Sequence, residues 1–297
     1  MTQNSTKKIL VIGRTGLIAS ELLKSLGSEY DIYTLSHSRQ SEGKNYYWDP
    51  LKKCIEIDAQ KFDIICNFSG YNIANKRWSE KIKDLLYRSR IDSTDLLHKH
   101  FKEFPPGLYI AASATGIYGN RETSCTETSA PGNGFLAGLC KKWEASSMQF
   151  SNSNSRVVIL RFGLVLSAHG GALAKMLPPF RFGLGAKLSS GKQHMPWISI
   201  NDSISIIKFV ISNTEISGPV NCVSHSLPNS EFTDVLAKVL KRPALLKMPA
   251  LILNLIFGKE MTDELLLCST PCKAEKLSKY GFEFNDTDLP QTLRKLI

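Results

Sequence analysis

The sequence predicts an α/β protein, in which a doubly wound parallel sheet is followed by a smaller, mostly helical C-terminal lobe. Three observations support this fold class. Short runs of β-forming apolar residues alternate with helix-period segments in the first half of the chain. A turn that contains Gly13 and Gly16 joins the first such run to the first helix. From Ser230 onward, the apolar residues mostly follow helical spacing.

The elements of the predicted sheet follow one another in regular alternation. The expected strands are residues 8–12, 31–35, 62–67, 108–112 and 157–160, and the expected helices are residues 17–26, 79–101 and 135–150. Such alternation indicates a parallel sheet with helices on both faces. We therefore expect residues 7–165 to form the larger domain, to which residues 195–225 return.

The C-terminal lobe is predicted from an apolar stripe along one helix. The stripe recurs at positions i, i+3, i+4, i+7 and i+8, with Ser230 as the N-cap and Pro243 as the stop signal. Its members are Phe232, Val235, Leu236, Val239 and Leu240. We expect residues 166–194 and 226–297 to form this smaller lobe and to bind the substrate.

The composition is that of a globular protein with a substantial core. Of the 297 residues, 42% are apolar and 22% are charged. The N-terminal apolar run reaches Gly13 too soon for a secretory signal, and no stretch approaches the roughly 18 apolar residues of a membrane span. The most apolar segment, residues 248–257, contains Pro249 and Asn254 and is expected to be a buried helix. We therefore predict a cytoplasmic protein without a membrane partner.

Charge and cysteine content argue against two further kinds of site. The net charge of +10 suggests nucleic acid, yet lysines alternate with acids, as in residues 79–84, and no zinc-finger or RNA-binding signature is present. Nucleic-acid binding, an alternative that rests on charge alone, would weaken steeply with salt. The seven cysteines are scattered and odd in number, and Cys268 and Cys272 have no nearby His or second pair. We expect neither a metal site nor a nucleic-acid partner.

The segment KILVIGRTGLIASELLKSL, residues 8–26, has the pattern of a phosphate-binding turn. Gly13 and Gly16 permit backbone conformations and a close approach that a Cβ atom would block. Ala19 is small enough for the helix to contact the strand. The helix that follows directs its N-terminal amide groups and the positive end of its dipole toward an anion. The turn therefore predicts a dinucleotide in a Rossmann-type fold, with a ligand-free glycine turn as the alternative.

Further motifs make the chain resemble one family. The turn resembles that of the extended branch of the short-chain dehydrogenase/reductase superfamily, and residues 67–70 (NFSG) stand where that superfamily has an Asn-x-Ala-Gly loop. The other matching motifs are NKRWS at 75–79, SRIDST at 89–94, SATGIYG at 113–119, LCKKWE at 139–144, GGAL at 170–173, MLPPF at 176–180, WI at 197–198 and RPA at 242–244. Together they resemble the NAD(P)-binding, nucleotide-sugar epimerase-like proteins that carry a C-terminal domain of unknown function. The resemblance runs from about Lys8 to the C-terminus.

The resemblance implies a nicotinamide dinucleotide and a place for it. The adenosine and ribose would lie along Asn67, Ser69 and Gly70. The pyrophosphate would lie on the turn and the first residues of its helix, which are Gly13, Arg14, Thr15, Gly16, Leu17 and Ile18.

The end of the second strand bears on the choice between the two dinucleotides. An acid there would bind the ribose 2′-hydroxyl of NAD, whereas basic groups accept the 2′-phosphate of NADP. Residues 34–39 (TLSHSR) contain no acid. His37 stands where members of the family commonly have Arg, and Arg14 and Arg39 could supply the charge. We therefore expect NADP, with NAD as the alternative.

The catalytic residues that the resemblance implies are incomplete. Enzymes of the superfamily use a Tyr-x-x-x-Lys pair on one helix and a Ser at the end of an earlier strand. Ser113 matches this Ser, but the expected Tyr and Lys fall on Leu136 and Cys140 when counted back from Glu144. Tyr118 is our first candidate for the acid/base residue. Its alternative role is to pack beside the cofactor.

Two functions remain open at this point. The chain could be an NAD(P)-dependent epimerase or oxidoreductase that acts on a nucleotide sugar or a small carbonyl compound, with Tyr118 or the region of Lys175 and Arg181 as the proton source. It could instead bind the dinucleotide without turnover and act as a sensor or scaffold through linkage. Arg181, Lys187 and Lys192 could bind a substrate diphosphate or be surface charge. A homodimer through the helices at residues 79–101 and 135–150, as in extended relatives, also stays open.

Overall fold

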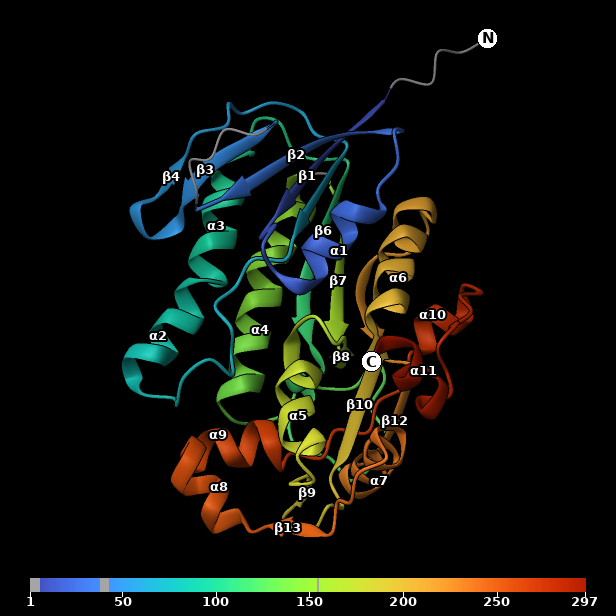
Figure 1. Cartoon of the computed structure of the whole chain (residues 1–297). Coiled ribbons are helices and arrows are strands. Elements are labelled where there is room, and N and C mark those ends of the chain that lie inside the picture. The colour runs from blue at the N-terminus through green and yellow to red at the C-terminus, as the bar shows by residue number, and fades with distance from the viewer. Residues whose placement is uncertain (1–5, 38–42, 154) are drawn as a thin grey trace.

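The structure, a computed structural model, describes residues 6–37, 43–153 and 155–297. Within these ranges the larger domain is built on an eight-stranded sheet with the strand order β11-β7-β6-β5-β1-β2-β3-β4 (Figure 1). Neighbouring strands pair in parallel, except that β4 runs antiparallel to β3. The strands are β1 (Lys7–Ile12), β2 (Tyr30–Ser36), β3 (Asn45–Asp49), β4 (Cys54–Ile55), β5 (Ile64–Asn67), β6 (Leu108–Ala114), β7 (Arg156–Phe162) and β11 (Gly218–Cys222).

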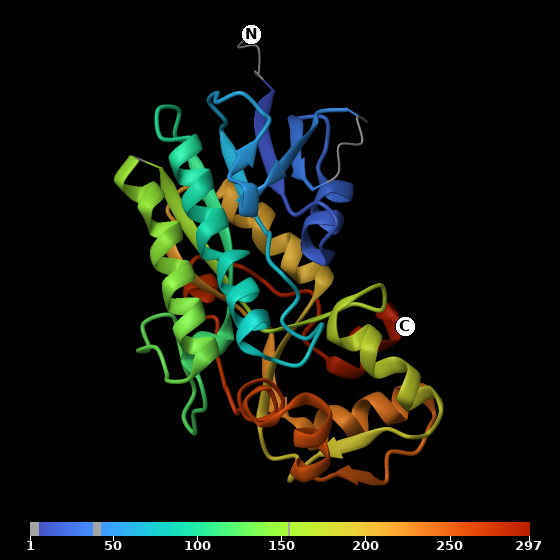
Figure 2. The same cartoon turned by 90° about the vertical axis from the view of Figure 1, so that its left-hand side faces the viewer.

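Helices cover both faces of this sheet, as Figures 1 and 2 show. Leu22 of one helix and Ile207 of another join Val11 of β1 in one core, while Leu97 lies in a second core on the opposite face with Leu10. The first face is covered by α1 (Leu17–Ser25) and α6 (Ile200–Ser212), and the second by α2 (Glu80–Arg88), α3 (Ile91–His100) and α4 (Phe135–Met148). Because both faces are covered, β1 is apolar and buried at every position from Ile9 to Ile12. The predicted doubly wound α/β fold is confirmed.

The smaller lobe combines helices with two short sheets. A three-stranded sheet has the order β12-β10-β8, and a two-stranded sheet joins β13 to β9. These strands are β8 (Leu164–Leu166), β9 (Ala186–Leu188), β10 (His194–Ser199), β12 (His225–Pro228) and β13 (Leu246–Met248). The helices are α5 (Gly171–Arg181), α7 (Asn229–Leu240), α8 (Ala250–Phe257), α9 (Lys259–Met261) and α11 (Leu289–Leu296), whereas α10 (Glu275–Lys279) packs on the large sheet. Short turns complete the fold: η1 (Pro50–Lys52), η2 (Thr115–Tyr118), η3 (Gln149–Ser153) and η4 (Thr262–Leu266).

The C-terminal segment crosses the domain boundary expected from the sequence. Ala274 and Leu277 are buried in the core of the large domain, and Phe282 and Phe284 pack against the same core. α11 then returns to the lobe, where Leu293 joins the core that holds Phe232. The sequence gives no sign of this crossing, because an apolar side chain does not specify which of two cores it enters.

The long helix expected at residues 79–101 is broken into α2 and α3. At the break, Ser89 donates its hydroxyl hydrogen to the carbonyl oxygen of Leu86 and accepts a hydrogen bond from the Tyr71 amide. Arg90 donates to the carbonyl oxygens of Leu86 and Tyr71. These side chains compete with the helical hydrogen-bond ladder, which accounts for the break.

The segment expected to be a buried helix is instead exposed. α8 buries Leu253, but Leu251 and Leu255 are 80% and 79% exposed. The prediction was wrong because it assumed that so apolar a helix must have protein on all sides. In Figures 1 and 2, α8 and β13 lie at the end of the molecule farthest from the N-terminus. Across the three described ranges, no helix has the length and hydrophobicity needed to cross a bilayer.

Candidate functional site

The glycine turn at the end of β1 comes very close to the loop that follows β5. Gly13 has φ +86°, and a Cβ atom on it would lie 3.0 Å from the backbone of Phe68 and Ser69. The amide of Gly16 donates to the carbonyl oxygen of Gly13 at 2.8 Å, which closes the turn. Gly16 is the N-cap of α1 and, as a glycine, has no side chain with which to cap it. The first amides of α1 are therefore left without a side-chain cap, as a pyrophosphate site requires.

The residues predicted for the adenosine side have a second role inside the protein. Asn67 is buried, and its amide nitrogen donates to the hydroxyl oxygens of Tyr109 and Thr94. Its amide oxygen accepts from the backbone and hydroxyl of Ser69. A Cβ atom on Gly70 would lie 3.2 Å from the guanidinium carbon of Arg90. The side chain of Asn67 therefore fixes the shape of the loop, and ligand contacts from this loop would come from its other atoms.

Two of the three basic residues expected near a 2′-phosphate lie within the described part of the chain. His37 is exposed at the end of β2, where its ring lies 6.0 Å from that of Trp48 in a stacked arrangement. Arg14 is half-buried in the glycine turn. Arg39, the other residue expected near a 2′-phosphate, lies outside the described residues. The structure thus places the predicted Arg14 within the turn and His37 at the neighbouring strand end.

A buried network of hydrogen bonds surrounds Ser113 at the end of β6. The hydroxyl of Ser113 donates to Glu144 Oε1 at 2.7 Å, and Arg161 donates to both oxygens of that carboxylate at 2.8 Å. Arg161 also donates to the hydroxyl oxygen of Tyr118 at 2.9 Å, and this hydroxyl donates to Asn221 Oδ1 at 2.7 Å. All five residues are buried. The network joins β6, η2, α4, β7 and β11.

The charges within this network stabilise one another. Burial alone would lower the pKa of Arg161, but the hydrogen bonds and charge of Glu144 outweigh it and raise that pKa. Burial raises the pKa of Tyr118 to about 12, although Arg161 acts in the opposite direction. Tyr118 is therefore protonated at neutral pH, and Asn221 already accepts its only hydroxyl hydrogen. The geometry favours a packing role for this phenol over the acid/base role predicted from the sequence.

The two positions at which the resemblance expects Tyr and Lys are apolar and buried. Leu136 and Cys140 lie on α4 with exposed fractions of 7% and 6%. Burial raises the pKa of the Cys140 thiol to about 11, so the thiol is neutral near pH 7. Neither residue can supply the phenol or the positive charge of the usual pair.

The N-terminus of α4 is capped from the other lobe. The amides of Phe135 and Leu136 donate to the two carboxylate oxygens of Glu264 at 2.9 and 2.7 Å. A cavity of about 350 Å³ lies at this junction, between Gly116 and Leu136 on one side and Glu264 on the other. Gly116 belongs to η2 and Leu136 to α4, and these two elements also carry Tyr118 and Glu144 of the Ser113 network, so the cavity lies beside that network.

The basic residues predicted for a substrate diphosphate are not gathered at that cavity. Lys175 donates to the carbonyl oxygen of Ala74 at 3.0 Å, and Lys187 forms an ion pair of 2.9 Å with Asp234. Arg181 and Lys192 are exposed. Among the described residues, none of these four lines either of the two described cavities.

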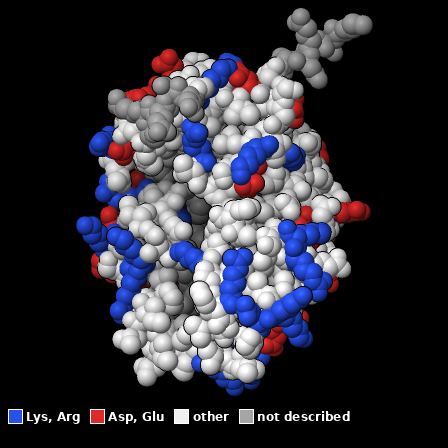
Figure 3. Space-filling model, viewed as in Figure 1, with Lys and Arg blue, Asp and Glu red and all other residues white. Residues whose placement is uncertain are grey.

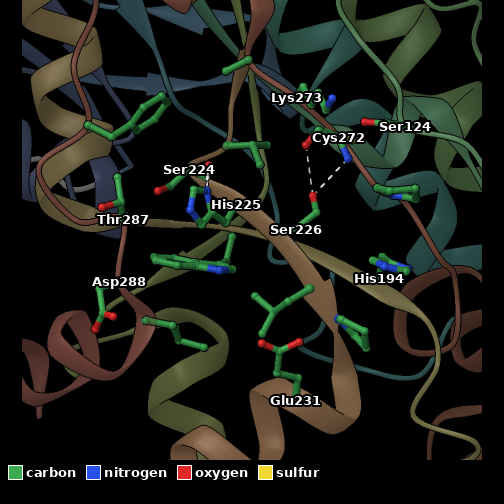
Figure 4. A pocket seen from close by; sticks show the side chains of 18 of the residues that line it. Ser124, His194, Ser224, His225, Ser226, Glu231, Cys272, Lys273, Thr287 and Asp288 are labelled. Atoms are coloured by element: carbon green, nitrogen blue, oxygen red, sulfur yellow. Dashed lines mark hydrogen bonds between the residues drawn. The ribbon is translucent and has the colours of Figure 1, made fainter.

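A larger groove of about 1040 Å³ lies elsewhere, on the C-terminal lobe. Figure 4 shows His225, Glu231 and Asp288 beside it, with the Ser226 hydroxyl bonded to the backbone of Cys272. No residue that the sequence singled out as catalytic or cofactor-binding lines this groove among those described. We therefore place the candidate site at the glycine turn and the Ser113 network, and not in the larger of the two described cavities. In the described ranges, no cluster of three or more His, Cys, Asp or Glu residues could hold a metal ion.

Comparison with known proteins identifies the family. Residues 9–222 match the NAD dependent epimerase/dehydratase family, and residues 248–296 match a domain of unknown function, DUF1731. The chain belongs to this epimerase/dehydratase family. The family predicted from the sequence motifs is thus confirmed.

Close relatives of this epimerase/dehydratase chain match it over nearly its whole length. Epimerase family protein Mb2239 of Mycobacterium bovis is 34% identical over 96% of each chain. Epimerase family protein SA0724 of Staphylococcus aureus is 35% identical over 98% of this chain and 99% of its own. The crystal structure of human epimerase family protein SDR39U1 with NADPH is 28% identical, with a TM-score of 0.89, over 97% of this chain and 98% of that one. A UDP-glucuronic acid 4-epimerase from Bacillus cereus, 17% identical with a TM-score of 0.77, shares the fold.

One part of the site was not predicted from the sequence. Glu144 was used only to count positions along its helix, and Arg161 was not singled out. A usable signal exists, because Arg161 is the only charged residue inside the apolar run VVILRF of β7, and a charge buried in a central strand needs a partner.

Proposed function

We propose that this family member binds NADP(H) at the glycine turn and acts as an NAD(P)-dependent epimerase or oxidoreductase on a nucleotide sugar or a small carbonyl compound. The observation that carries the proposal is the close contact of Gly13 with the backbone of Phe68 and Ser69, which leaves no room for a Cβ atom, beside an α1 helix whose N-cap makes no side-chain hydrogen bond. The human relative described with NADPH supports the same cofactor here.

The residues present fit such a cofactor. The proposed pyrophosphate contacts come from Gly13, Arg14, Thr15, Gly16, Leu17 and Ile18. Asn67, Ser69 and Gly70 would border the adenosine side, and His37 would lie near the 2′-phosphate. When bound, the nicotinamide supplies reversible acceptance of a hydride. NAD is the alternative cofactor.

Ser113 is the proposed contact for the substrate hydroxyl. Its own hydrogen is donated to Glu144, and the Cys140 thiol interacts with Ser113 Oγ, which leaves one lone pair of that oxygen to accept a hydrogen bond from the substrate hydroxyl. A proton released there can pass to Ser113 as the Ser113 proton passes to Glu144. Arg161 holds the carboxylate in place through hydrogen bonds to both of its oxygens. In this scheme Tyr118 fixes Arg161 and takes no proton.

A second candidate function rests on the apolar wall of α4. Leu136 and Cys140 stand where other members of the superfamily carry the proton donor and its lysine, so the chain could bind the dinucleotide without turnover and act as a sensor or scaffold. In that case its affinity for a partner would change with cofactor occupancy.

Turnover separates the two candidates. The purified chain would be incubated with NADP or NADPH and a panel of UDP- and dTDP-sugars and small carbonyl compounds, while absorbance at the nicotinamide band and sugar products are followed. Epimerase or oxidoreductase activity predicts a steady rate that Ser113→Ala removes. Cofactor binding with no product from any member of the panel would favour the sensor.

A further inference from the structure

An apolar tip stands out on the small lobe. Among the described residues, twelve large apolar side chains are exposed, and eight of them lie in two neighbouring segments. The eight are Phe182, Leu184, Leu245, Leu246, Leu251, Ile252, Leu255 and Ile256. Pairing of β9 with β13 brings the two segments together, and Gly183 faces the ring of Pro243. Apolar surface gathered in this way is typical of a binding surface.

The helix in this tip has its apolar side turned outward. Leu253 anchors α8 in the protein, with 2% of its surface exposed. Leu251 and Leu255 are one helical turn apart and therefore share one face, which is directed to solvent. Neither described cavity is lined by any of the eight residues of the tip. The tip is thus a projection and not a groove, so it does not offer a slot for a partner helix.

The surroundings of the tip are strongly basic. Residues 171–193 contain four Lys or Arg residues and residues 235–259 contain five, and neither segment contains an Asp or Glu. Eight of these nine side chains are exposed, while Lys187 is half-buried and pairs with Asp234, and Lys259 pairs with Asp263. In Figure 3, the lower left of the molecule, over α8, is white, and blue side chains lie above it and along the bottom edge. The tip therefore combines insertable apolar side chains with positive charge.

We infer that the apolar tip binds the surface of an anionic lipid bilayer. Large apolar side chains on an exposed helix can enter the boundary between headgroups and acyl chains, while Lys and Arg contact anionic headgroups. A second copy of the chain fits less well, because a two-fold contact through the tip would bring the same positive charges together. The sequence-based expectation of no membrane partner considered spanning segments, and a surface helix needs no such length.

Vesicle sedimentation tests this inference. The full chain would be mixed with vesicles of phosphatidylcholine alone or of equal parts phosphatidylcholine and phosphatidylglycerol, and the pelleted fraction measured. We expect binding to the anionic vesicles that is at least about tenfold tighter than to the neutral ones and that weakens as salt is raised. No pelleting with anionic vesicles at low salt would overturn the inference.

Matched variants assign the binding to the tip. The double variant Leu251→Ser/Leu255→Ser and the double variant Arg242→Ser/Lys247→Ser should each reduce the pelleted fraction at least about tenfold. Phe104→Ser and Lys102→Ser change an apolar and a basic residue outside the tip and should leave it unchanged. Each variant should have the unfolding temperature of the wild type, which verifies that it is folded. Equal loss in the tip and control variants, or no loss in the tip variants, contradicts the assignment.

The oligomeric state shows whether a second copy of the chain, and not a bilayer, covers the tip. Light scattering of the free chain should show the same mass for wild type and Leu251→Ser/Leu255→Ser. A wild-type dimer that this variant dissociates, together with no vesicle binding, would overturn the lipid assignment and give the tip to a second copy. The vesicle measurements need no nicotinamide cofactor, so their failure leaves the proposed redox function untouched.

Discussion

The hydroxyl of Ser113 donates a hydrogen bond of 2.7 Å to the carboxylate of Glu144, which Arg161 holds from its other side. This pairing lies at the end of β6, near Leu136 and Cys140, the positions on α4 at which the resemblance expects Tyr and Lys. In the proposed function, the pairing is the route by which a substrate proton leaves. The consequences of this pairing can be measured on folded protein.

Removing the Ser113 hydroxyl should separate catalysis from cofactor binding. Ser113→Ala should lower kcat by about a hundredfold or more, because a positioned acid/base group contributes that much. The dissociation constant for NADPH should not change, because the proposed phosphate contacts lie at the glycine turn. Ser25→Ala, which removes a hydroxyl that bonds within α1, is the control. An unaltered kcat in Ser113→Ala would contradict the proposed proton route.

Neutralising Glu144 should destabilise the fold. Glu144→Gln leaves the buried Arg161 without its charged partner, and breaking a buried ion pair in this way costs about 3 to 5 kcal/mol of the free energy of unfolding. Glu21→Gln breaks an exposed pair with Lys24 and should cost about 1 kcal/mol or less. Urea unfolding of the two variants measures both values. Similar costs would show that the buried pair adds nothing beyond a surface contact.

Tyr118 should affect stability at alkaline pH and not turnover. Its pKa of about 12 in the folded chain exceeds its ordinary value of 10.0, so the folded state retains the proton longer than the unfolded state. The stability that comes from this group is therefore complete below about pH 10 and is lost as the pH rises toward about pH 12. Tyr118→Phe should flatten the loss of stability over this range and keep most of the activity. Loss of activity with unchanged stability would restore the phenol as the acid/base residue.

Two glycines with similar backbone angles provide a matched test of the turn. Gly13 and Gly43 have φ +86° and +66°, so alanine at either position costs about 1 kcal/mol or more of conformational strain. A Cβ atom at Gly43 meets nothing within 4 Å, whereas at Gly13 it meets the Phe68 backbone at 3.0 Å. Gly13→Ala should therefore lower the unfolding temperature more than Gly43→Ala does. Equal decreases in unfolding temperature would mean that the loop after β5 moves aside for the Cβ atom at no cost in free energy.

Much of the fold follows from local sequence pattern. Where the structure departs from that pattern, the physical reason can be identified. The turn at Gly13 was predicted because its glycine spacing lies between a buried strand and a helix. The break between α2 and α3 depends on Arg90 reaching the carbonyl of Tyr71, a contact across 19 residues that periodicity does not reveal. The exposure of Leu251 was missed because hydrophobicity alone does not say whether a helix faces protein or solvent.

The candidate site was predictable only where a motif encodes backbone shape. Gly13 and Gly16 are recognisable because a turn of this kind demands glycine. The pairing of Glu144 with Arg161 joins α4 to β7, and only their packing in three dimensions brings the two side chains together. Ser113 was identified from its motif, but its partner was not.

The central claim is that the glycine turn holds a dinucleotide. It is tested most directly by calorimetric titration of NADPH into the wild-type chain, Gly13→Ala and Gly43→Ala. The account predicts saturable binding by the wild type and by Gly43→Ala, with a loss of at least about tenfold in affinity for Gly13→Ala, because its Cβ atom displaces the loop that shapes the turn. Wild-type protein that takes up neither NADPH nor NADH, or a Gly13→Ala variant that binds as tightly as wild type, would contradict it.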